Sequence, residues 1–274
     1  MAAYTGLRPV VVVTGGSEGI GYALARRFAG AGHDVILIAR RPEPLEEAAR
    51  RIREEFKVEA VALPLDLRSP DAISAIEAAL AAGGAYADVL VNSAGIGFAG
   101  RFHEQAPEEV VQLIDLNIRA LTALTRNFLP GMRERGRGGI VNLASLGSYA
   151  PGPFQANYYA SKAYVLSLSE AIASECAGEG VRVMALAPGP VNTGFHDRMR
   201  AKNALYRLLV PPASADSVAR AGHRGFTLGL RVVVPGFFNP FLAIAMSILP
   251  HRLVIPIIGW LLQPRGDEAD HAGR

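Results

Sequence analysis

Residues 157–164 read NYYASKAY and contain three tyrosines and one lysine within eight positions. On a helix, residues four apart share a face, whereas neighbouring residues point about 100° apart. Tyr158 can therefore reach Lys162, and Tyr159 cannot. A phenol with an ordinary pKa of about 10 exchanges protons poorly at neutral pH, and a nearby ammonium lowers that pKa. Tyr158 and Lys162 form a candidate acid–base pair, while Tyr159 is assigned to packing or a partner subunit and Tyr164 to packing.

Ser145 is a second candidate for the same chemistry. It follows the run IVNLA at residues 140–144, which is typical of a buried strand. A serine in this place lies at the carboxyl edge of a parallel sheet, where its hydroxyl can donate to a substrate oxygen and share developing negative charge. A plain turn serine is the alternative, and the tyrosine motif favours the first interpretation.

A glycine-rich stretch, TGGSEGIG at residues 14–21, lies between the apolar run Val10–Val13 and a helical pattern from Tyr22 to Ala29. Glycines between a strand and a helix let the backbone approach a pyrophosphate, and the helix N-terminus supplies free N–H groups. This pattern suits a dinucleotide. A tight turn without a ligand is the alternative.

The second apolar run, Val35–Ile38, ends at Ala39, Arg40 and Arg41. A site for NAD places an acidic side chain here, about twenty residues beyond the glycine loop, to bind the ribose 2′-hydroxyl. An arginine instead suits the 2′-phosphate of NADP, and Ser17 could donate a second hydrogen bond. We therefore predict NADP(H) in preference to NAD(H), with a solvated arginine as the alternative.

Short apolar runs alternate with longer helical patterns along the chain. Such alternation predicts an α/β fold with a doubly wound parallel sheet of the Rossmann type, about seven strands and helices on both faces. Ligands bind such sheets at the carboxyl ends of the strands. We predict one domain over residues 1–274, with its core at about 9–235. The predicted strands are Val10–Val13, Val35–Ile38, Val58–Leu65, Val89–Val91, Ile140–Leu143, Val181–Leu186 and Arg231–Val234.

The carboxyl-terminal part is strongly apolar, and residues 232–250 carry no charge. Prolines, a glycine and an asparagine at 235–240 interrupt the run, so that what remains is too short to span a membrane. We predict apolar helices over 236–265, lying over a cleft or a subunit neighbour, and a polar tail at 266–274. Contact with a membrane surface is the lesser alternative. Together with this segment, four aromatic residues could line a cleft for a lipophilic substrate: Phe98, Phe102, Phe154 and Phe195.

Composition excludes several classes of protein. Of the 274 residues, 50% are hydrophobic and 19% are charged, which excludes a disordered chain. The net charge of +3 is spread along the sequence, so no nucleic acid is expected. The single cysteine, Cys176, excludes an internal disulfide, and the six histidines show no metal-ligand spacing. No secretion signal is recognisable at the N-terminus, so the cytoplasm is the expected location.

Six motifs occur together in one order. They are TGGSEGIG from residue 14, NSAG from residue 92, an isolated Asn117, LAS ending at Ser145, YYASK with Tyr158 and Lys162, and PGPVNT from residue 188. In this order and spacing the chain resembles the short-chain dehydrogenase/reductase family over roughly residues 9–195. Its glycine spacing and length are similar to those of the single-domain NADP-dependent reductases, and not to the extended branch that handles nucleotide sugars.

The resemblance implies a role for each motif. It makes Asn117, in a helical pattern from Pro107 to about Met132, the holder of a water that links Lys162 to solvent through a locally distorted helix. Asp66 resembles the ligand of the adenine amino group, with Leu67 beside it, and Lys162 resembles a ribose ligand. It also implies a homodimer or homotetramer built from the helices carrying Asn117 and Tyr158. The implied cofactor-binding set is Gly15, Ser17, Gly19, Ile20, Gly21, Arg40, Arg41, Asp66, Leu67, Asn92, Ala94, Gly95, Tyr158, Lys162, Pro188, Gly189, Val191 and Thr193.

These observations predict an NADP(H)-dependent oxidoreductase that exchanges hydride between the nicotinamide and a carbonyl or alcohol of a lipophilic compound. Tyr158 is then the general acid or base, Ser145 the donor to the substrate oxygen, and Lys162 the modifier of the tyrosine pKa. Two alternatives are a catalytically idle NADP-binding sensor and a membrane-surface interaction protein on the same fold. An intact serine, tyrosine and lysine set favours the enzyme.

Overall fold

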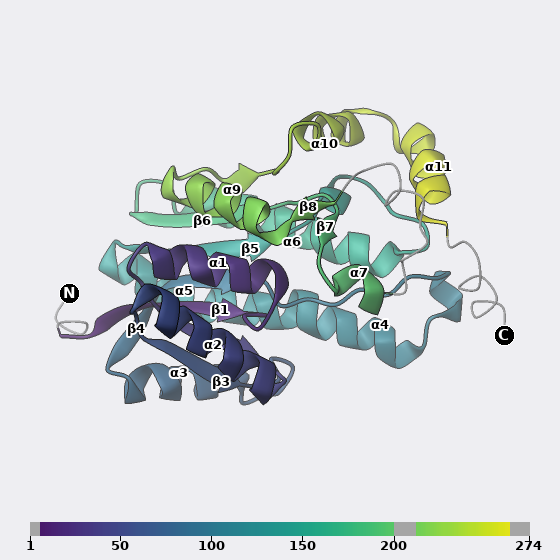
Figure 1. Ribbon diagram of the computed structural model, residues 1–274. Coiled ribbons are helices and arrows are strands. Elements are labelled where there is room, and N and C mark those ends of the chain that lie inside the picture. The colour runs from purple at the N-terminus through teal and green to yellow at the C-terminus, as the bar shows by residue number, and fades with distance from the viewer. Residues whose placement is uncertain (1–5, 200–211, 264–274) are drawn as a thin grey trace.

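The computed structural model describes residues 6–199 and 212–263. Seven parallel strands form one sheet in the order β3-β2-β1-β4-β5-β6-β9, with helices on both sides of it (Figure 1). The predicted doubly wound fold is confirmed. The strands are β1 (Arg8–Thr14), β2 (Asp34–Ala39), β3 (Ala60–Pro64), β4 (Ala85–Asn92), β5 (Gly138–Leu143), β6 (Val181–Leu186) and β9 (Val232–Val233).

Helices follow most of the strands and cover the sheet. They are α1 (Gly19–Gly30), α2 (Pro42–Phe56), α3 (Ala72–Ala82), α4 (Pro107–Ile114), α5 (Leu121–Arg135), α6 (Ala156–Glu175), α7 (Phe195–Arg198), α9 (Ala215–Thr227), α10 (Asn239–Ile248) and α11 (His251–Leu262). Two short strands, β7 (Val191–Asn192) and β8 (Ala213–Ser214), pair outside the main sheet.

The continuous apolar run of β1 is explained by burial on both faces. Val11 and Val13 pack with α1, α2 and α9, whereas Val10 and Val12 pack with α3, α5 and α6. Because successive side chains of a strand point to opposite faces, a strand covered on both sides favours apolar residues at every position. The same reasoning accounts for the apolar runs of β2 and β6.

Strand β4 begins four residues before the predicted Val89. Its early part, Ala85 to Ala87, lacks the β-branched residues that mark a strand in sequence. Pairing with β1 nevertheless extends through it, and the register shifts so that Val10 opposes Ala87 while Val11 opposes Val89. Asp88 falls at this irregularity, and its carboxylate accepts a hydrogen bond of 3.1 Å from Arg137.

A buried polar network ties the centre of the sheet to two helices. The Asn92 amide on β4 donates to Asn142 on β5 at 2.9 Å and to Thr125 on α5 at 3.1 Å. Asn142 in turn donates to Ser169 on α6 at 2.9 Å. Since unpaired polar groups in a core are costly, these bonds fix one register of β4, β5 and α6.

The predicted seventh strand is present as β9, whose Val232 and Val233 pair with the end of β6. After it the chain forms α10 and α11, which lie outside the layers that enclose the sheet (Figure 1). Both helices are as apolar as the sequence indicates, so the predicted apolar helical extension is confirmed.

Replacing Asn142 by alanine tests the polar network. The change removes one of the two partners of the Asn92 amide and the donor to the Ser169 hydroxyl oxygen, in a fully buried site. We expect Asn142→Ala to lower the free energy of unfolding by about 2 to 4 kcal/mol in urea denaturation followed by circular dichroism. Asn127→Ala, which removes only an exposed bond to Glu77, is the control and should change it by less than about 1 kcal/mol. Equal losses in the two variants would contradict the structural role of the network.

Candidate active site

The glycine loop after β1 leaves its backbone open toward the carboxyl edge of the sheet. Gly15 and Gly19 have φ values of 66° and 61°, a region that favours glycine. Gly21 lies in the first turn of α1, and a Cβ there would be 2.3 Å from the Gly15 carbonyl oxygen. The helix N-terminus thus packs directly on the loop, and the Thr193 methyl group would lie 3.4 Å from a Cβ at Gly19.

Thr14, at the end of β1, connects this loop to the turn after β4. Its hydroxyl oxygen accepts hydrogen bonds from the backbone N–H groups of Ser93 and Ala94, at 3.0 and 3.1 Å, and donates to the Val91 carbonyl at 3.2 Å. The sequence analysis did not single out Thr14. The only sequence signal for it is a polar residue closing a fully apolar strand.

Asn117 lies in a π-helical segment, Asp115–Ala120, between α4 and α5. This segment is the local distortion of the helix that the family resemblance implies. The Asn117 side chain is 1% exposed, accepts from the Ile96 N–H at 2.9 Å and donates to the Ile96 carbonyl at 2.9 Å. A further bond of 3.2 Å to the Ser161 hydroxyl joins it to α6. The side chain therefore fixes the turn after β4 against the helix that carries Tyr158.

Ser145, Tyr158 and Lys162 come together at the carboxyl ends of β5 and β6. The Ser145 side chain lies close enough to the Tyr158 hydroxyl to lower its pKa. The Lys162 ammonium donates to the Leu143 carbonyl at 2.7 Å and lies 5.7 Å from the centre of the Tyr158 ring. One turn of α6 thus places the lysine over the tyrosine, as the spacing predicts.

Ser148 holds Ser145 in place. The Ser148 hydroxyl accepts from the Ser145 N–H at 3.2 Å and donates to the Lys162 carbonyl at 2.8 Å. The Ser145 oxygen also accepts from the Gly147 N–H at 3.1 Å. These bonds attach the short helical turn Leu146–Tyr149 to α6, so that the serine and the tyrosine cannot shift independently.

Burial opposes the charged form of both candidate proton-transfer groups. It raises the pKa of Tyr158 to about 12, against a smaller lowering by the Ser145 hydrogen bond. It lowers the pKa of Lys162 to about 8. In this structure the loss of solvation therefore outweighs the effect that the sequence predicts, in which the ammonium lowers the tyrosine pKa.

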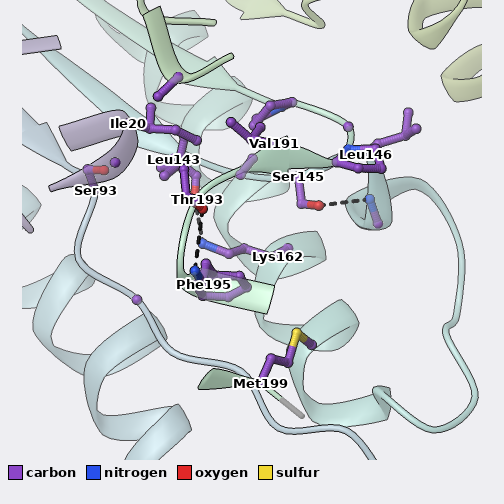
Figure 2. A pocket seen from close by; sticks show the side chains of 18 of the residues that line it. Ile20, Ser93, Leu143, Ser145, Leu146, Lys162, Val191, Thr193, Phe195 and Met199 are labelled. Carbon is purple, nitrogen blue, oxygen red and sulfur yellow. Dashed lines mark hydrogen bonds between the residues drawn. The ribbon is translucent and has the colours of Figure 1, made fainter. Parts of the chain in front are cut away.

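A cavity of about 640 Å³ opens in front of these three residues, and Figure 2 shows side chains that line it. The glycine loop forms one wall, the segment Pro188–Phe195 forms another, and α10 and α11 close it with apolar side chains. Among the predicted cofactor residues, it is lined by Gly15, Ser17, Gly19, Ile20, Gly21, Ala94, Gly95, Tyr158, Lys162, Pro188, Gly189, Val191 and Thr193.

Only one of the four aromatic residues expected in the substrate cleft lines this cavity. The Phe195 ring lies 5.5 Å from that of Tyr158. Phe98 lines the neighbouring cavity instead, Phe102 is 56% exposed, and Phe154 packs with the buried face of α11. The prediction was wrong for Phe102 and Phe154, because an aromatic side chain in sequence does not reveal whether it faces a cavity, a helix or solvent.

A second cavity of about 340 Å³ adjoins the first along the ends of β2 and β3. Arg40, Arg41, Asp66 and Leu67 line it. The Asp66 carboxylate accepts from the Arg68 guanidinium at 2.6 Å, and this bond lowers the pKa of Asp66 to about 2. Arg41 forms an ion pair with Glu18 at 3.5 Å. Arg40 is exposed and forms no hydrogen bond or ion pair with the described residues, but its charge helps to lower the pKa of Asp66.

Two residues differ from the sequence analysis in what they present to these cavities. Asn92 is 2% exposed, and its side chain belongs to the buried network, so only its backbone is available to a ligand. Gln155, which the sequence analysis did not name, lines the larger cavity, is 3% exposed, and has an amide nitrogen without a hydrogen-bond partner. Its place three residues before Tyr158 puts both on one face of α6.

The described residues contain no group of three or more histidine, cysteine or acidic side chains that could hold a metal. The sequence likewise predicts none. The chemistry available at the cavity includes that of the Ser145 and Tyr158 hydroxyl groups and the Lys162 ammonium, beside a glycine loop shaped for a phosphate-containing ligand.

Comparison with known proteins identifies the family of this chain. The model of the short chain dehydrogenase family matches residues 9–204, and the chain therefore belongs to that family. A very-long-chain 3-oxoacyl-CoA reductase of Bos taurus is 35% identical over 186 residues, which cover 66% of this chain and 59% of the bovine protein. The chain thus matches less than two thirds of the length of that relative.

Two solved structures share the fold. A short-chain dehydrogenase from Sphingobium yanoikuyae in complex with NADPH superimposes with a TM-score of 0.76 at 32% identity, over 88% of this chain and 96% of the other. The L-sorbose reductase of Gluconobacter frateurii, complexed with NADPH and L-sorbose, has a TM-score of 0.74 at 28% identity, over 89% and 99% of the two chains.

The lowered pKa of Lys162 can be measured directly, because the chain has only three lysines. With lysine labelled by ¹³C at Cε, we expect one resonance to titrate with a midpoint of about 8, since burial favours the neutral amine. The side chain is then an ammonium below this pH and a neutral amine above it. Lys162→Met should remove that resonance, and Lys57→Met should keep it. A midpoint for Lys162 at or above its ordinary value would contradict the effect of burial.

Proposed function

We propose that this protein is an NADP(H)-dependent oxidoreductase that exchanges hydride between a nicotinamide and a carbonyl or alcohol group. The observation that carries the proposal is the meeting of Ser145, Tyr158 and Lys162 at the wall of a cavity into which the glycine loop also opens. Membership of the short chain dehydrogenase family supports it.

The residues around the cavity suit a bound dinucleotide. The Gly21 position has no room for a side chain, and the Gly15 φ of 66° needs a glycine. Both features keep the N-terminus of α1 accessible to a pyrophosphate. We propose that the glycine loop binds the pyrophosphate, that Lys162 binds the ribose, and that Asp66 and Leu67 lie beside the adenine. Thr193 and its neighbours in Pro188–Thr193 then contact the nicotinamide.

Tyr158 is the proton donor in the proposed reduction. The reduced nicotinamide supplies the hydride when it is bound, and the substrate oxygen gains negative charge. With a pKa of about 12, Tyr158 stays protonated at neutral pH, and an alkoxide is a stronger base than a phenolate, so the proton passes to the substrate oxygen. Ser145 donates a second hydrogen bond to the same oxygen. In the oxidation direction the tyrosine accepts the proton.

Lys162 and Asn117 support this proton transfer. The Lys162 ammonium stabilises the phenolate that Tyr158 becomes after it has donated. Asn117 fixes the Ile96 backbone and Ser161, and a Cβ on the neighbouring Gly95 would lie 3.3 Å from its side-chain oxygen and 3.6 Å from the Lys162 nitrogen. This closeness supports a route for protons from solvent past Asn117 to Lys162.

Arg40 supports a preference for NADP over NAD. It lies at the end of β2 in the second cavity, where a dinucleotide extended from the glycine loop would place its adenosine ribose. The Arg40 guanidinium forms no hydrogen bond or ion pair with the described residues, although its charge acts on Asp66 in the same cavity. Its donors are therefore available to a 2′-phosphate, and Ser17 lines the same cavity.

The walls of the larger cavity support a lipophilic substrate. Leu242, Met246 and Leu261 line it from α10 and α11, opposite the polar groups of the glycine loop. Gln155 offers one unpaired amide to a polar group of the substrate. The similar proteins include both an acyl-CoA reductase and a sugar reductase, so their names do not indicate one class of substrate. The proposal of a lipophilic substrate therefore depends on the apolar wall of the cavity.

We further propose that residues 1–274 act as one domain within a homodimer or homotetramer. The helices that carry Asn117 and Tyr158 support this, because α4 exposes Val111 and Ile114, and α6 exposes Tyr164. The Tyr164 hydroxyl on α6 is also hydrogen-bonded to the Thr122 hydroxyl on α5 at 3.1 Å, so α5 and α6 are in contact at this exposed surface.

A catalytically idle sensor on the same fold is the second candidate. It would bind the cofactor without needing a proton donor against the cavity. The closeness of Ser145 to Tyr158, with Lys162 beside them, favours the enzyme, since nothing in cofactor binding alone requires that arrangement.

Substitution of Tyr158 by phenylalanine separates these two functions. We expect Tyr158→Phe to lower kcat for reduction of hydrophobic ketones and aldehydes by about a hundred- to ten-thousand-fold, because the ring stays and only the proton donor is lost. The measurement is the decrease of NADPH absorbance over a panel of carbonyl compounds, with NADPH affinity followed by fluorescence. Tyr164→Phe is the matched control and should keep full activity. If Tyr158→Phe were as active as the wild type, the mechanism would be wrong, and if no carbonyl were reduced by the wild type, the sensor would be favoured.

Substitution of Arg40 tests the cofactor preference. We expect Arg40→Gln to weaken NADPH binding by about 10- to 100-fold and to leave NADH binding unchanged, since only the contact with the 2′-phosphate is lost. Fluorescence titration with both cofactors gives the two dissociation constants. Arg182→Gln removes an exposed arginine from the amino end of β6, at the opposite edge of the sheet, and should change neither constant. Tighter binding of NADH than of NADPH by the wild type would rule out the preference.

A further inference from the structure

The outer surface of α10 and α11 and of the loop before them is almost entirely apolar. Phe237, Phe238 and Phe241 are 79%, 72% and 65% exposed, and Ile248 is 75% exposed. We call this surface the outer face, and it consists of Phe237, Phe238, Phe241, Leu242, Ile244, Ile248, Leu249, Leu253, Ile257 and Trp260. A continuous apolar surface of this kind on two neighbouring helices is typical of an interaction site.

Helix α11 is apolar on two sides, which lie about 100° apart around its axis. Val254, Ile258 and Leu262 are buried against Ala150, while Leu253 and Ile257 point outward at the same spacing of four residues. A helix that only covers a protein core has polar residues on its outer side. Packing within the described part of the molecule therefore explains the inner side of α11 and leaves its outer side unexplained.

The charged residues in the carboxyl-terminal part of the sequence are almost all basic, although Arg220 is paired with Asp216. Between Asp216 and Asp267 the chain contains five arginines and two histidines and not a single acidic residue. Arg252 lies on α11 next to Leu253, is exposed, and has no ion-pair partner among the described residues. An apolar surface beside unpaired cations is complementary to a layer of anionic lipid headgroups over acyl chains.

The same charges disfavour a second copy of the chain as the occupant. A two-fold contact would bring Arg252 and His251 of both copies to one interface with no carboxylate from this segment to pair with them. Three phenylalanines that project from a loop and a helix N-terminus also suit insertion between lipids better than a flat contact.

The helices are too short to cross a bilayer. With 10 and 12 residues, α10 and α11 are about 15 and 18 Å long at about 1.5 Å per residue, against a hydrocarbon thickness of about 30 Å. Across residues 6–199 and 212–263, the structure contains no helix with the length and hydropathy that a membrane span requires. Contact must therefore be parallel to the membrane surface.

We propose that the outer face of α10 and α11 docks onto the surface of an anionic lipid bilayer. Figure 1 shows both helices at one side of the molecule, away from the helices that cover the sheet, so the face can meet a flat surface. Leu242 belongs to the outer face and also lines the larger cavity. If the proposed function is correct, a substrate dissolved in the bilayer is thereby brought to the apolar wall of that cavity.

The test is binding of the full-length protein to vesicles, without substrate or cofactor. We expect the protein to float with vesicles of phosphatidylcholine and phosphatidylglycerol, and to bind those of phosphatidylcholine alone about tenfold more weakly. Phe237→Ser/Phe241→Ser should weaken binding by about tenfold or more, because it removes the inserted rings. Its control is Leu7→Ser/Val61→Ser, which removes exposed apolar side chains from β3 and from the residue before β1.

The contribution of charge is measured by Arg252→Glu. It should weaken binding to the anionic vesicles several-fold more than Arg182→Glu, which changes the net charge equally at the amino end of β6. Circular dichroism and the melting temperature establish that each variant is folded. These readouts do not involve activity, so a failed assay for the proposed function leaves them intact.

Two outcomes would overturn the proposal. One is the absence of binding to either kind of vesicle by the folded wild type. The other is unchanged vesicle binding by Phe237→Ser/Phe241→Ser. A lower mass of that variant than of the wild type in light scattering, without vesicle binding by either, would assign the outer face to a second copy of the chain.

Discussion

The close approach of the carboxyl ends of β1 and β4 is the constraint on which the site depends. The strand order reverses between these strands, because the chain winds from β1 toward β3 on one side and from β4 toward β9 on the other. The two following loops therefore leave the sheet in opposite directions and open a crevice. The Thr14 hydroxyl holds that crevice in shape through Ser93, Ala94 and Val91, and glycines keep its floor free of side chains. The shape of the crevice thus depends on the buried Thr14 hydroxyl and on the lack of side chains at Gly15 and Gly21.

The reactive half depends on a second constraint, which is the loss of water around Tyr158 and Lys162. Placing both groups against the sheet edge fixes their geometry, but burial keeps each of them neutral over a wider range of pH. A phenol with a pKa of about 12 keeps its proton at neutral pH. It donates the proton only when negative charge develops on an oxygen beside it. In the proposed mechanism, this burial makes proton transfer from Tyr158 depend on the charge that develops on the substrate oxygen. Ser148 and Asn117 stabilise this arrangement. Ser148 is hydrogen-bonded to Ser145 after β5 and to Lys162 on α6, and Asn117 is hydrogen-bonded to Ser161 on α6.

The sequence predicted structure correctly where a residue type or spacing is found mainly in one structural environment. Apolar runs predicted the buried strands, the glycines predicted an open loop, and four-residue spacing predicted the pairing of Tyr158 with Lys162. It was uninformative where the same residue type serves several environments. Phe154 and Phe195 look alike in sequence, yet one packs on α11 and the other faces the cavity. Asn92 belongs to a motif and turns its side chain into a core network, whereas the unremarked Gln155 faces the cavity. Such choices depend on contacts between segments far apart in the chain, which no local pattern contains.

The carboxyl-terminal helices differ from the rest in how firmly they are attached. Strand β1 buries every residue from Val10 to Thr14, but α10 buries only Ala243, and α11 rests on three buried side chains. Local opening requires less free energy where fewer apolar contacts must be broken. We infer that the cavity has a rigid side that binds the cofactor and a weakly attached side that meets the substrate. A wall of this kind can adapt to apolar molecules of different shape without disturbing Tyr158, because α6 is anchored to the sheet through Ser169 and not through α10. One fold can then fix the geometry at the reacting oxygen and still accept different shapes at the far end of the substrate.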